Sequence, residues 1–362
     1  MDTFAFIIHP IDPKRDVSRK YPLLGKVLSE NQINFFSTFF PPVYISEIEG
    51  ITSEATGKQI KGWFLACPFT PKRMLELPEK VVYQKIIQTG RLAEKLGANI
   101  LGLGAFTSVV GDAGITIARE LDVPVTTGDS YTVSLAVEAV QKAAEVMEIP
   151  FDSATAAVVG ATGAIGKVCA ELLADAVGEL YLIGRRKEAL EALRERLQPR
   201  ARARLHVSTS MDVLRHANLI LTVTSALHDV IRPEYLQAGA VVCDVARPRD
   251  VSAMVAAARD DILVIDGGMV DVPGPVDFHF NFGFPTGKSY ACMAETMALA
   301  LEGRFVDYTL GKDITRAQVE DIAVIAKKHG FRLSGFRSFE KAITPEQIEA
   351  VRQNAKKSRR QS

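Results

Sequence analysis

The chain has 362 residues, of which 47% are hydrophobic, and its 43 basic and 43 acidic side chains give a formal net charge of zero. This length predicts two ordinary domains, and the balanced charge argues against general nucleic-acid binding. The four cysteines, at positions 67, 169, 243 and 292, show neither metal-ligand spacing nor a disulfide framework, and the chain has no secretory signal pattern and no membrane-length apolar run. We therefore expect a cytoplasmic protein without an integral membrane segment.

Residues 1–130 are predicted to form an α/β domain that carries the substrate. Within it, Asn99–Gly104 and Val123–Thr126 have the apolar character of buried strands. These strands open into Ala105–Val109 and Thr127–Tyr131, two loops that offer hydroxyl groups and backbone amides. A helix over residues 132–147 is expected to lead into the next domain.

A glycine-rich turn in mid-chain predicts a nucleotide cofactor. The segment Val158-Val-Gly-Ala-Thr-Gly-Ala-Ile-Gly166 lies between an apolar strand over 155–159 and a helix over 164–176. Its three glycines supply the tight turn, the close approach to a pyrophosphate and the close helix–strand packing of dinucleotide-binding folds. The free amides at the start of the helix would point at phosphate oxygens.

The residues after the second strand of this domain favour NADP over NAD. Leu180–Ile183 ends in Gly184-Arg185-Arg186-Lys187, where NAD-binding proteins usually carry an acidic residue for the ribose hydroxyls. We expect at least one of Arg185 and Arg186 to contact the 2′-phosphate. The alternative is that these charges merely begin a solvated helix over 187–197.

Three further strands, over 218–224, 240–244 and 262–266, predict a doubly wound parallel sheet of the Rossmann type. Such sheets hold ligands at strand ends, so Thr222–Ser225 and Asp266–Gly268 are expected to face the nicotinamide half, unless they serve only as turns. The predicted NADP-binding domain spans 131–285, followed by a helical return and basic tail over 286–362. The predicted cofactor-binding residues are Gly160, Thr162, Gly163, Ala164, Ile165, Gly166, Arg185, Arg186, Thr224 and Gly267.

The residue expected opposite the nicotinamide is Cys292, which follows a loop rich in proline and glycine. If Ser289 caps the helix that runs to Glu302, Cys292 lies in the first turn, where amides and the helix dipole favour a thiolate. A thiolate there could attack an acyl group. The alternative is a small buried cysteine that packs on a helix face.

The segment Tyr290-Ala-Cys-Met-Ala-Glu-Thr-Met-Ala-Leu-Ala-Leu-Glu-Gly303 resembles the corresponding segment of the cyanobacterial long-chain acyl-[acyl carrier protein] reductases. The resemblance spans nearly the whole chain, since it recurs in order at Arg15–Arg19, Thr56–Lys58, Gly102–Ser108, Thr126–Gly128, Val158–Gly166 and Lys328–Phe331. It implies that NADPH reduces a fatty acyl thioester of acyl carrier protein or coenzyme A to a fatty aldehyde. It also implies an acyl-cysteine intermediate on Cys292.

The implied mechanism has Cys292 displace the carrier thiol, the bound thioester accept a hydride, and a thiohemiacetal collapse to the aldehyde. Amides at the start of the 289–302 helix are candidates to stabilise the oxyanions, and Ser108, Thr107 or Tyr131 are candidates to assist through their hydroxyls. His279 and Lys288 are available as proton donors, although each is more typical of a surface or loop. Cys67, at a strand end, and Cys169, in the helix after the glycine turn, also match family positions, but structural roles are favoured there.

The chain departs from the family pattern in two places. Leu333–Glu340 and the basic tail extend it, and the loop Gly128–Thr132 differs from the family, which tends to have asparagine and histidine there, so that Asp129 would alter polarity near the acyl site. Residues 312–362 hold twelve basic and six acidic side chains. This excess suits an acidic acyl carrier protein or the phosphates of coenzyme A, or it belongs to a frayed tail at Lys356–Arg360.

A long acyl chain needs a long apolar cavity in the first domain. The aromatic residues that could line it, unless they are simply core, are Phe35, Phe36, Phe39, Phe40, Trp63 and Phe64.

Two other functions stay open. A shikimate-dehydrogenase-like alcohol oxidoreductase shares the plan of a substrate part followed by a nucleotide part, but its Asn-x-Thr-x-Pro-x-x-Lys pattern is missing from the first domain. A non-catalytic NADP-binding sensor is the second alternative. For the acyl reductase, the expected partners are the thioester carrier and, where the aldehyde is passed on, an enzyme that accepts it.

Overall fold

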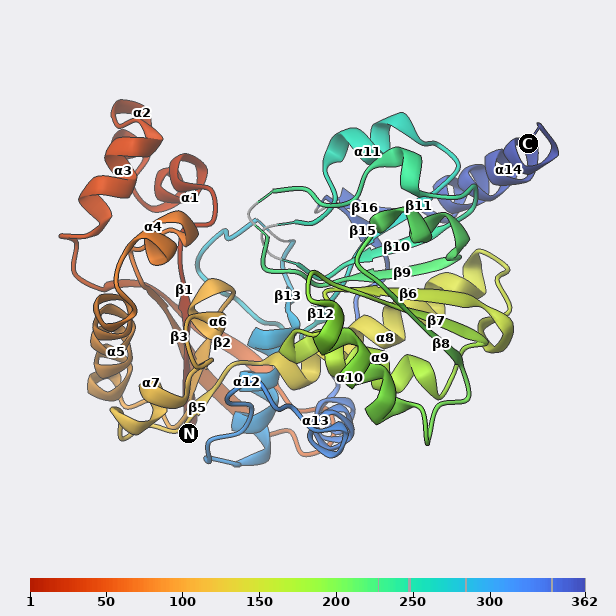
Figure 1. The fold of residues 1–362 in the computed structure, drawn as a ribbon. Coiled ribbons are helices and arrows are strands. Elements are labelled where there is room, and N and C mark those ends of the chain that lie inside the picture. Colours follow the sequence, from red (N-terminus) through yellow and green to blue (C-terminus); the bar gives the residue numbers. More distant parts are fainter. Residues whose placement is uncertain (227, 247–248, 284, 340, 362) are drawn as a thin grey trace. The chain divides into compact units, whose positions relative to one another are not determined.

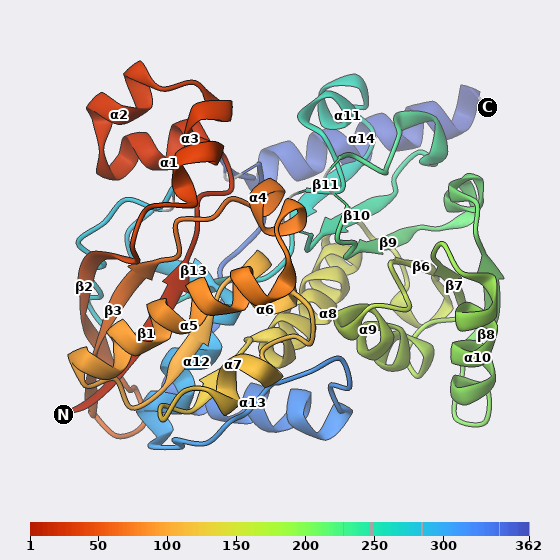
Figure 2. The same cartoon turned by 60° about the vertical axis from the view of Figure 1, so that its left-hand side comes forward.

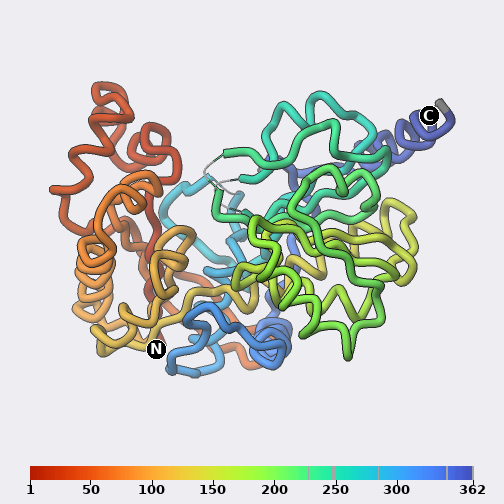
Figure 3. The backbone as a smooth tube through the Cα atoms, viewed as in Figure 1, coloured from red at the N-terminus to blue at the C-terminus, as the bar shows by residue number. Residues whose placement is uncertain are grey.

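Two sheets of mainly parallel strands organise the chain, one in each of two structural units. The structure is a computed structural model that describes residues 1–226, 228–246, 249–283, 285–339 and 341–361. Unit 1 comprises residues 1–131, 270–314 and 320–332, and unit 2 comprises residues 132–269, 315–319 and 333–362 (Figure 1). Figure 3 traces the chain by colour and shows that unit 1 combines the red-to-yellow N-terminal part with a blue segment from later in the sequence.

The sheet of unit 1 has five strands in the order β2-β3-β1-β4-β5. All neighbouring strands are parallel except β2 and β3, which run antiparallel. The strands are β1 (Asp2–Ile8), β2 (Val43–Thr52), β3 (Gln59–Ala66), β4 (Leu101–Leu103) and β5 (Val125–Thr126). The two strands predicted from sequence are therefore both present, though shorter than expected.

Side chains alternate across β1 and so bury both faces of this sheet. Ala5 and Ile7 lie in one core cluster with Val82 and Ile86 of α5. On the opposite face, Gly102 faces Phe6 and Thr296 of α12, because an added Cβ at Gly102 would lie 2.1 Å from the Thr296 hydroxyl. Ten of the twelve residues of α12 are buried, as expected for a helix that is apolar all round.

The longer helices of unit 1 cover its sheet, and three short helices form a separate cluster. Figure 2 shows α5 in front of β1 and β3, and α1, α2 and α3 gathered as a separate small cluster. The helices are α1 (Pro13–Lys20), α2 (Pro22–Val27), α3 (Glu30–Ser37), α4 (Pro71–Glu76), α5 (Glu79–Leu96), α6 (Phe106–Val109), α7 (Ile115–Arg119), α12 (Ala291–Glu302) and α13 (Arg316–His329), of which the first four residues of α13 belong to unit 2. A small sheet in the order β13-β12-β14 is formed by β12 (Met269–Asp271), β13 (Lys288–Tyr290) and β14 (Arg332–Leu333).

The expected aromatic lining of an acyl cavity is only partly buried. Trp63 and Phe64 belong to the core, where Phe64 stacks on Phe278. By contrast, the four phenylalanines at positions 35, 36, 39 and 40 are between 41% and 71% exposed, so the core interpretation does not hold for them. They lie on and just after the short helix α3, which is too short to bury all of its apolar residues.

The sheet of unit 2 has six parallel strands in the order β8-β7-β6-β9-β10-β11. Numbered along the chain this is the order 3-2-1-4-5-6 of dinucleotide-binding folds, and the predicted doubly wound sheet is confirmed. The strands are β6 (Thr155–Val159), β7 (Glu179–Ile183), β8 (Arg204–Ser208), β9 (Leu219–Thr222), β10 (Val241–Asp244) and β11 (Leu263–Asp266). The helices are α8 (Asp129–Val146), α9 (Ala164–Ala174), α10 (Lys187–Leu197), α11 (Ala253–Ala258) and α14 (Pro345–Gln361), with 3₁₀ turns at Phe151–Ser153, Met211–His216 and Pro233–Tyr235.

The units divide the chain differently from the predicted domains. Residues 270–285, expected in the nucleotide domain, belong to unit 1, and the predicted 286–362 return is shared between the units. The reason is that α12 completes the core of the first sheet, a long-range pairing that no local pattern reveals. The helix α8 starts with three residues of unit 1 and continues in unit 2.

The basic tail is helical rather than frayed. Within α14, Arg352 lies 2.9 Å and Lys356 3.2 Å from carboxylate oxygens of Glu148, and Arg359 donates a hydrogen bond to the Ala238 carbonyl. The preceding extension forms the hairpin β15 (Arg337–Ser338) and β16 (Lys341–Ala342), while Glu340 and Ser362 lie outside the described residues. Within the described part of the chain, every helix is too short or too polar to span a bilayer.

Candidate active site

Cys292 lies at the second position of α12, as expected, but the helix starts differently. The cap residue is Tyr290, whose side chain makes no capping hydrogen bond. Ser289, predicted as the cap, is instead a buried residue of β13 whose hydroxyl donates to the Tyr290 carbonyl at 3.3 Å. The first-turn amides are therefore not occupied by a capping side chain. Cys292 itself is partly exposed to solvent.

The loop after β5 lies directly against Cys292. Gly128 has φ +78°, and an added Cβ would lie 2.2 Å from the Cys292 Cα and 2.3 Å from its Cβ. No side chain fits into that space, so glycine is required both by conformation and by the close approach of two backbones.

Glu295, one turn after Cys292, fixes this loop to α12. Its carboxylate accepts hydrogen bonds from the Thr126 hydroxyl at 2.5 Å, the Thr309 hydroxyl at 2.8 Å and the Tyr131 amide at 2.8 Å. The Thr309 hydroxyl also lies 2.9 Å from that of Ser130. Glu295 is fully buried, which raises the pKa of its carboxyl.

A second turn approaches the sulfur from the end of β4. Ala105 has φ +48°, which is rare for a residue other than glycine, and its backbone hydrogen bond helps to stabilise the charged form of Cys292. The next amide, of Phe106, donates to Nε2 of the buried His9 at 2.9 Å. Burial lowers the pKa of His9 to about 4, so this imidazole is neutral and acts as an acceptor that holds the strained turn in place.

The thiolate expected at Cys292 is not the resting form. The pKa of the thiol is raised to about 12, first because burial desolvates the thiolate and second because of the charge of Asp129. Backbone hydrogen bonds from Met293 and Ala105 oppose this rise. A helix terminus contributes about 0.3–1 kcal/mol to an anion, which is less than the desolvation that a buried anion has to overcome.

The other residues proposed for the acyl site have defined partners. Ser108 and Thr107 are buried and donate to the carbonyls of Ala105 and Gly104, at 2.6 and 2.8 Å, and so support the turn beside Cys292. Lys288 pairs with Asp271 at 2.5 Å.

His279, the other proton donor considered, is half exposed. It lies 3.3 Å from Asp277 and 3.6 Å from Glu49. Cys67 and Cys169 are fully buried, and burial raises the pKa of each thiol to about 12. Unlike Cys292, neither has any solvent exposure.

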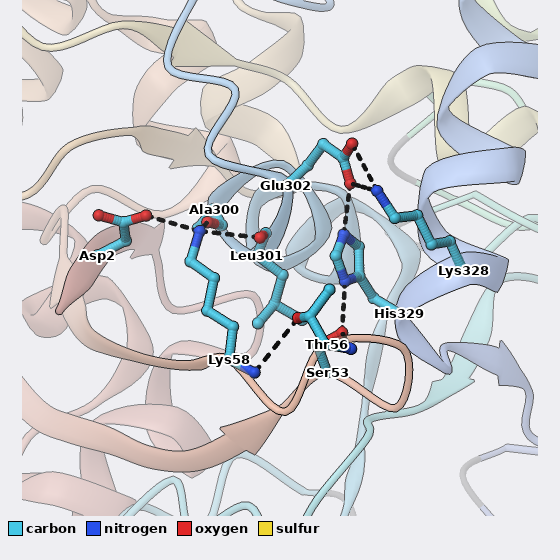
Figure 4. Close-up of polar contacts among 9 residues, drawn as sticks. All are labelled: Asp2, Ser53, Thr56, Lys58, Ala300, Leu301, Glu302, Lys328 and His329. Carbon is cyan, nitrogen blue, oxygen red and sulfur yellow. Dashed lines mark hydrogen bonds and ion pairs between the residues drawn. The ribbon is translucent and has the colours of Figure 1, made fainter.

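The far end of α12 is fixed by a charged network (Figure 4). Lys58 donates to the carbonyls of Ala300 and Leu301 at 3.1 and 2.9 Å and pairs with Asp2 at 2.6 Å. A cation at these last carbonyls stabilises the helix end.

Ser53, His329 and Glu302 complete this network. The His329 imidazole lies 2.6 Å from Glu302 through Nε2 and 2.8 Å from the Ser53 hydroxyl through Nδ1. The set has the composition of a Ser-His-acid triad, but Ser53 and His329 are 2% and 1% exposed, and the Ser53 oxygen also accepts from the Thr56 amide. Ser53, His329 and Glu302 therefore anchor α12 rather than meet a substrate. The anchor explains part of the Lys328–Phe331 motif, to which His329 belongs.

The glycine turn of unit 2 has the geometry of a pyrophosphate site. Gly160 has φ +86°, and an added Cβ at Gly166 would lie 2.2 Å from the Gly160 carbonyl, so α9 packs tightly on β6. Gly163 is the cap of α9 and offers no capping side chain, and an added Cβ there would meet only the Gly160 carbonyl at 3.3 Å. The backbone is thus open to a ligand at the point where a diphosphate would sit, and the site fits a dinucleotide.

The ends of β7, β9 and β11 carry the other predicted cofactor residues. Arg185 and Arg186 are exposed between β7 and α10, and Thr162, Ala164 and Ile165 are partly exposed beside the glycine turn. Thr224 donates its hydroxyl and its amide, the latter at 2.9 Å, to Asp250.

Asp250 and Asp266 shape these loops in ways that the sequence did not suggest. The buried Asp250 also accepts from the Thr222 hydroxyl at 2.6 Å and so holds the end of β9. The carboxylate of Asp266 forms an ion pair with Arg249, and Gly267 is buried, where an added Cβ would meet Val245. The segment 266–268, which was predicted to face the nicotinamide, therefore presents backbone groups rather than side chains.

Comparison with known proteins assigns the family. The family model described as shikimate / quinate 5-dehydrogenase matches residues 141–266, which lie in unit 2. The long-chain acyl-[acyl-carrier-protein] reductase of Synechococcus elongatus is 31% identical over 346 residues, which cover 91% of this chain and 98% of that protein. The chain belongs to this reductase family.

Two further similarities accompany the family assignment. The aminotransferase PigE of a Serratia species is 32% identical over 359 residues, which are 95% of this chain but 41% of that protein. The chain therefore spans well under half of the length of PigE. The solved L-tryptophan dehydrogenase from Nostoc punctiforme covers the whole chain at 14% identity, with a TM-score of 0.42.

The family assignment and the dinucleotide-binding unit together give the general activity. The chain is an oxidoreductase, and its cofactor is NADPH, as predicted from the sequence.

Proposed function

We propose that this reductase-family chain converts a fatty acyl thioester of acyl carrier protein or coenzyme A into a fatty aldehyde, through an acyl group held on Cys292. The observation that carries the proposal is the place of Cys292. Cys292 is partly exposed, whereas the other three cysteines are buried, and it lies in the first turn of a helix without a side-chain cap. The backbones of Met293 and Ala105 oppose the rise of its thiol pKa.

In the first half of the reaction, Cys292 Sγ attacks the acyl carbon and the carrier thiol departs. The oxyanion that forms there needs donors, and the uncapped amides at the start of α12 together with the strained Ala105 turn are suited to supply them. Ser108 and Thr107 support that turn through their hydrogen bonds to it. Glu295 keeps the loop at 126–131 pressed against the helix, which limits water access to the acyl group.

In the second half, bound NADPH would supply the hydride that reduces the acyl carbon, and the bond from that carbon to Cys292 Sγ then breaks to release the aldehyde and restore the thiol. Residues of unit 2 bind and orient the dinucleotide: the amides around Gly160, Thr162, Gly163, Ala164, Ile165 and Gly166 would hold its diphosphate, and Arg185 or Arg186 the 2′-phosphate. Thr224 and Gly267, at the ends of β9 and β11, line the same edge of the sheet.

Intact-protein mass spectrometry tests the proposal. Wild-type protein mixed with palmitoyl-coenzyme A without NADPH should gain the mass of one acyl group, and NADPH should then discharge it as aldehyde. Cys292→Ala should gain no acyl group, whereas Cys169→Ala, which removes a buried cysteine of unit 2, should acylate as the wild type does. If no adduct forms with coenzyme A or acyl carrier protein thioesters while NADPH still binds, the acyl-reductase function is wrong.

The shikimate-dehydrogenase-like alternative gains no specific support from the site. The matching family model ends at residue 266 and covers only nucleotide-binding structure, so it concerns the cofactor and not the substrate.

A further inference from the structure

Asp129 is a buried carboxylic acid beside Cys292. It directly follows Gly128, the glycine that lies against the Cys292 backbone, and it is the first residue of α8. Its exposed fraction is 5%. A carboxyl group that is buried this deeply normally has a cationic partner, but among the described residues Asp129 forms no ion pair with a lysine, arginine or histidine.

The groups that face Asp129 explain its protonation. From α12 these are Cys292 and Glu295, and from the preceding loop it is the Thr127 hydroxyl. Burial first, and then the charge of Glu295, raise the pKa of Asp129 to about 8, although the nearby Thr127 side chain opposes the rise. Asp129 therefore exchanges a proton within the range of neutral to mildly alkaline pH.

The proposed reaction needs such a group, because the Cys292 thiol holds its proton until attack. We propose that Asp129 accepts the proton of the Cys292 thiol as Sγ attacks the thioester and delivers it to the sulfur of the departing carrier. This inference rests on the proposed function. The bond from Sγ to the acyl carbon forms, the bond from that carbon to the carrier sulfur breaks, and one proton moves from Sγ through the Asp129 carboxylate to the carrier thiolate. No electron is gained or lost.

The other titratable groups near Cys292 are already committed. Both oxygens of Glu295 accept hydrogen bonds from Thr126, Thr309 and Tyr131, which leaves that carboxylate a fixed anchor. His9 uses Nε2 to accept the Phe106 amide and stays neutral. Lys288, considered from the sequence, is paired with Asp271.

The test follows the acylation step alone, so it needs no cofactor. The rate at which palmitoyl-coenzyme A acylates the protein is measured by quenched-flow mass spectrometry from pH 6 to 10 for wild type, Asp129→Asn and Asp122→Asn. Asp122 is an exposed aspartate of the same unit and controls for the loss of one carboxylate. Acylation of Asp129→Asn should be about 100-fold or more slower at pH 8, because general acid–base catalysis contributes about 10²–10⁴-fold.

Alkylation of Cys292 by iodoacetamide separates proton transfer from a structural role. The Asp129 charge raises the thiol pKa, so its removal should increase the thiolate fraction, and Asp129→Asn should alkylate faster than wild type at pH 9. Slower acylation combined with faster alkylation is the expected result. Acylation at the wild-type rate, or a parallel fall of both rates as from a collapsed site, overturns the role of Asp129. If the wild type itself does not acylate, the proposed function fails instead, and this inference with it.

Discussion

Replacing Gly128 by alanine probes the contact between the loop and Cys292. The new Cβ would lie 2.2 Å from the Cys292 Cα, a backbone atom that cannot rotate away. The positive φ of +78° adds a conformational penalty of about 1 kcal/mol, and overpacking of a filled site costs about 1–3 kcal/mol more. We therefore expect Gly128→Ala to lower the free energy of unfolding by about 2–4 kcal/mol, or to displace the start of α12.

The two penalties can be measured separately. Gly97, the C-terminal cap of α5 in the same unit, has φ +81°, but nothing lies within 4 Å of an added Cβ there. Gly97→Ala should thus carry the conformational penalty alone. Urea unfolding of both variants, monitored together with the rate of Cys292 acylation, gives the overlap cost by difference. Acylation should fall by about 100-fold in Gly128→Ala, since a shift of about 1 Å at a reacting atom has an effect of that size, and should stay near wild type in Gly97→Ala.

Equal stability losses in the two variants, with normal acylation in both, would refute this reasoning. That result would mean that the loop and α12 yield at negligible cost and that Cys292 does not depend on their contact.

The remaining predictions concern the cofactor and the thiol. The double substitution of Arg185 and Arg186 by glutamate should weaken NADPH binding by at least about 10-fold in fluorescence titrations and leave NADH binding little changed, because a charge-assisted contact to phosphate contributes about 1.5–3 kcal/mol. The double substitution of the exposed Arg196 and Arg200 by glutamate is the charge-matched control, and equal weakening by both would contradict the 2′-phosphate assignment. Alkylation of Cys292 in the wild type should rise continuously from pH 7 to 10, since only the thiolate reacts and its pKa is raised to about 12; a plateau below pH 8 would show that the helix terminus stabilises the thiolate after all.

The features that the sequence predicted are those set by local spacing. The glycine turn between β6 and α9 depends on neighbours within ten residues, and α10 has the predicted bounds because its apolar residues recur at helical intervals. The position of Cys292 in the first turn was likewise readable from the loop and the apolar run around it.

The features that the sequence did not predict depend on contacts across long stretches of chain. The prediction of a resting thiolate at Cys292 was wrong. The pKa of its thiol is raised by desolvation and by the charge of Asp129, and both effects arise from tertiary packing. Ser289 pairs in a small sheet rather than capping α12. Glu295 left one signal, a carboxylate in the middle of a largely apolar helix, which indicates a buried acid with dedicated partners.

His9 and Asp250 left no such signal. Each is a common polar residue in a loop or at a strand end, and their importance appears only with the amides they accept from, those of Phe106 and Thr224. Neither the strain at Ala105 nor the loop at the end of β9 can be inferred from one sequence.

The division of unit 1 into three stretches of chain has a consequence during synthesis. The helix α12 covers one face of the β1–β5 sheet, so this face stays open until residue 302 has been made. By contrast, the main part of unit 2, residues 132–269, is contiguous and is complete earlier in synthesis. About 170 residues separate β5 from α12. At a synthesis rate of about 5–20 residues per second, the apolar strands stay without their cover for roughly 10–35 s. We expect the nascent chain to form the nucleotide-binding sheet first and to need protection of its N-terminal half from aggregation until the helix that bears Cys292 emerges.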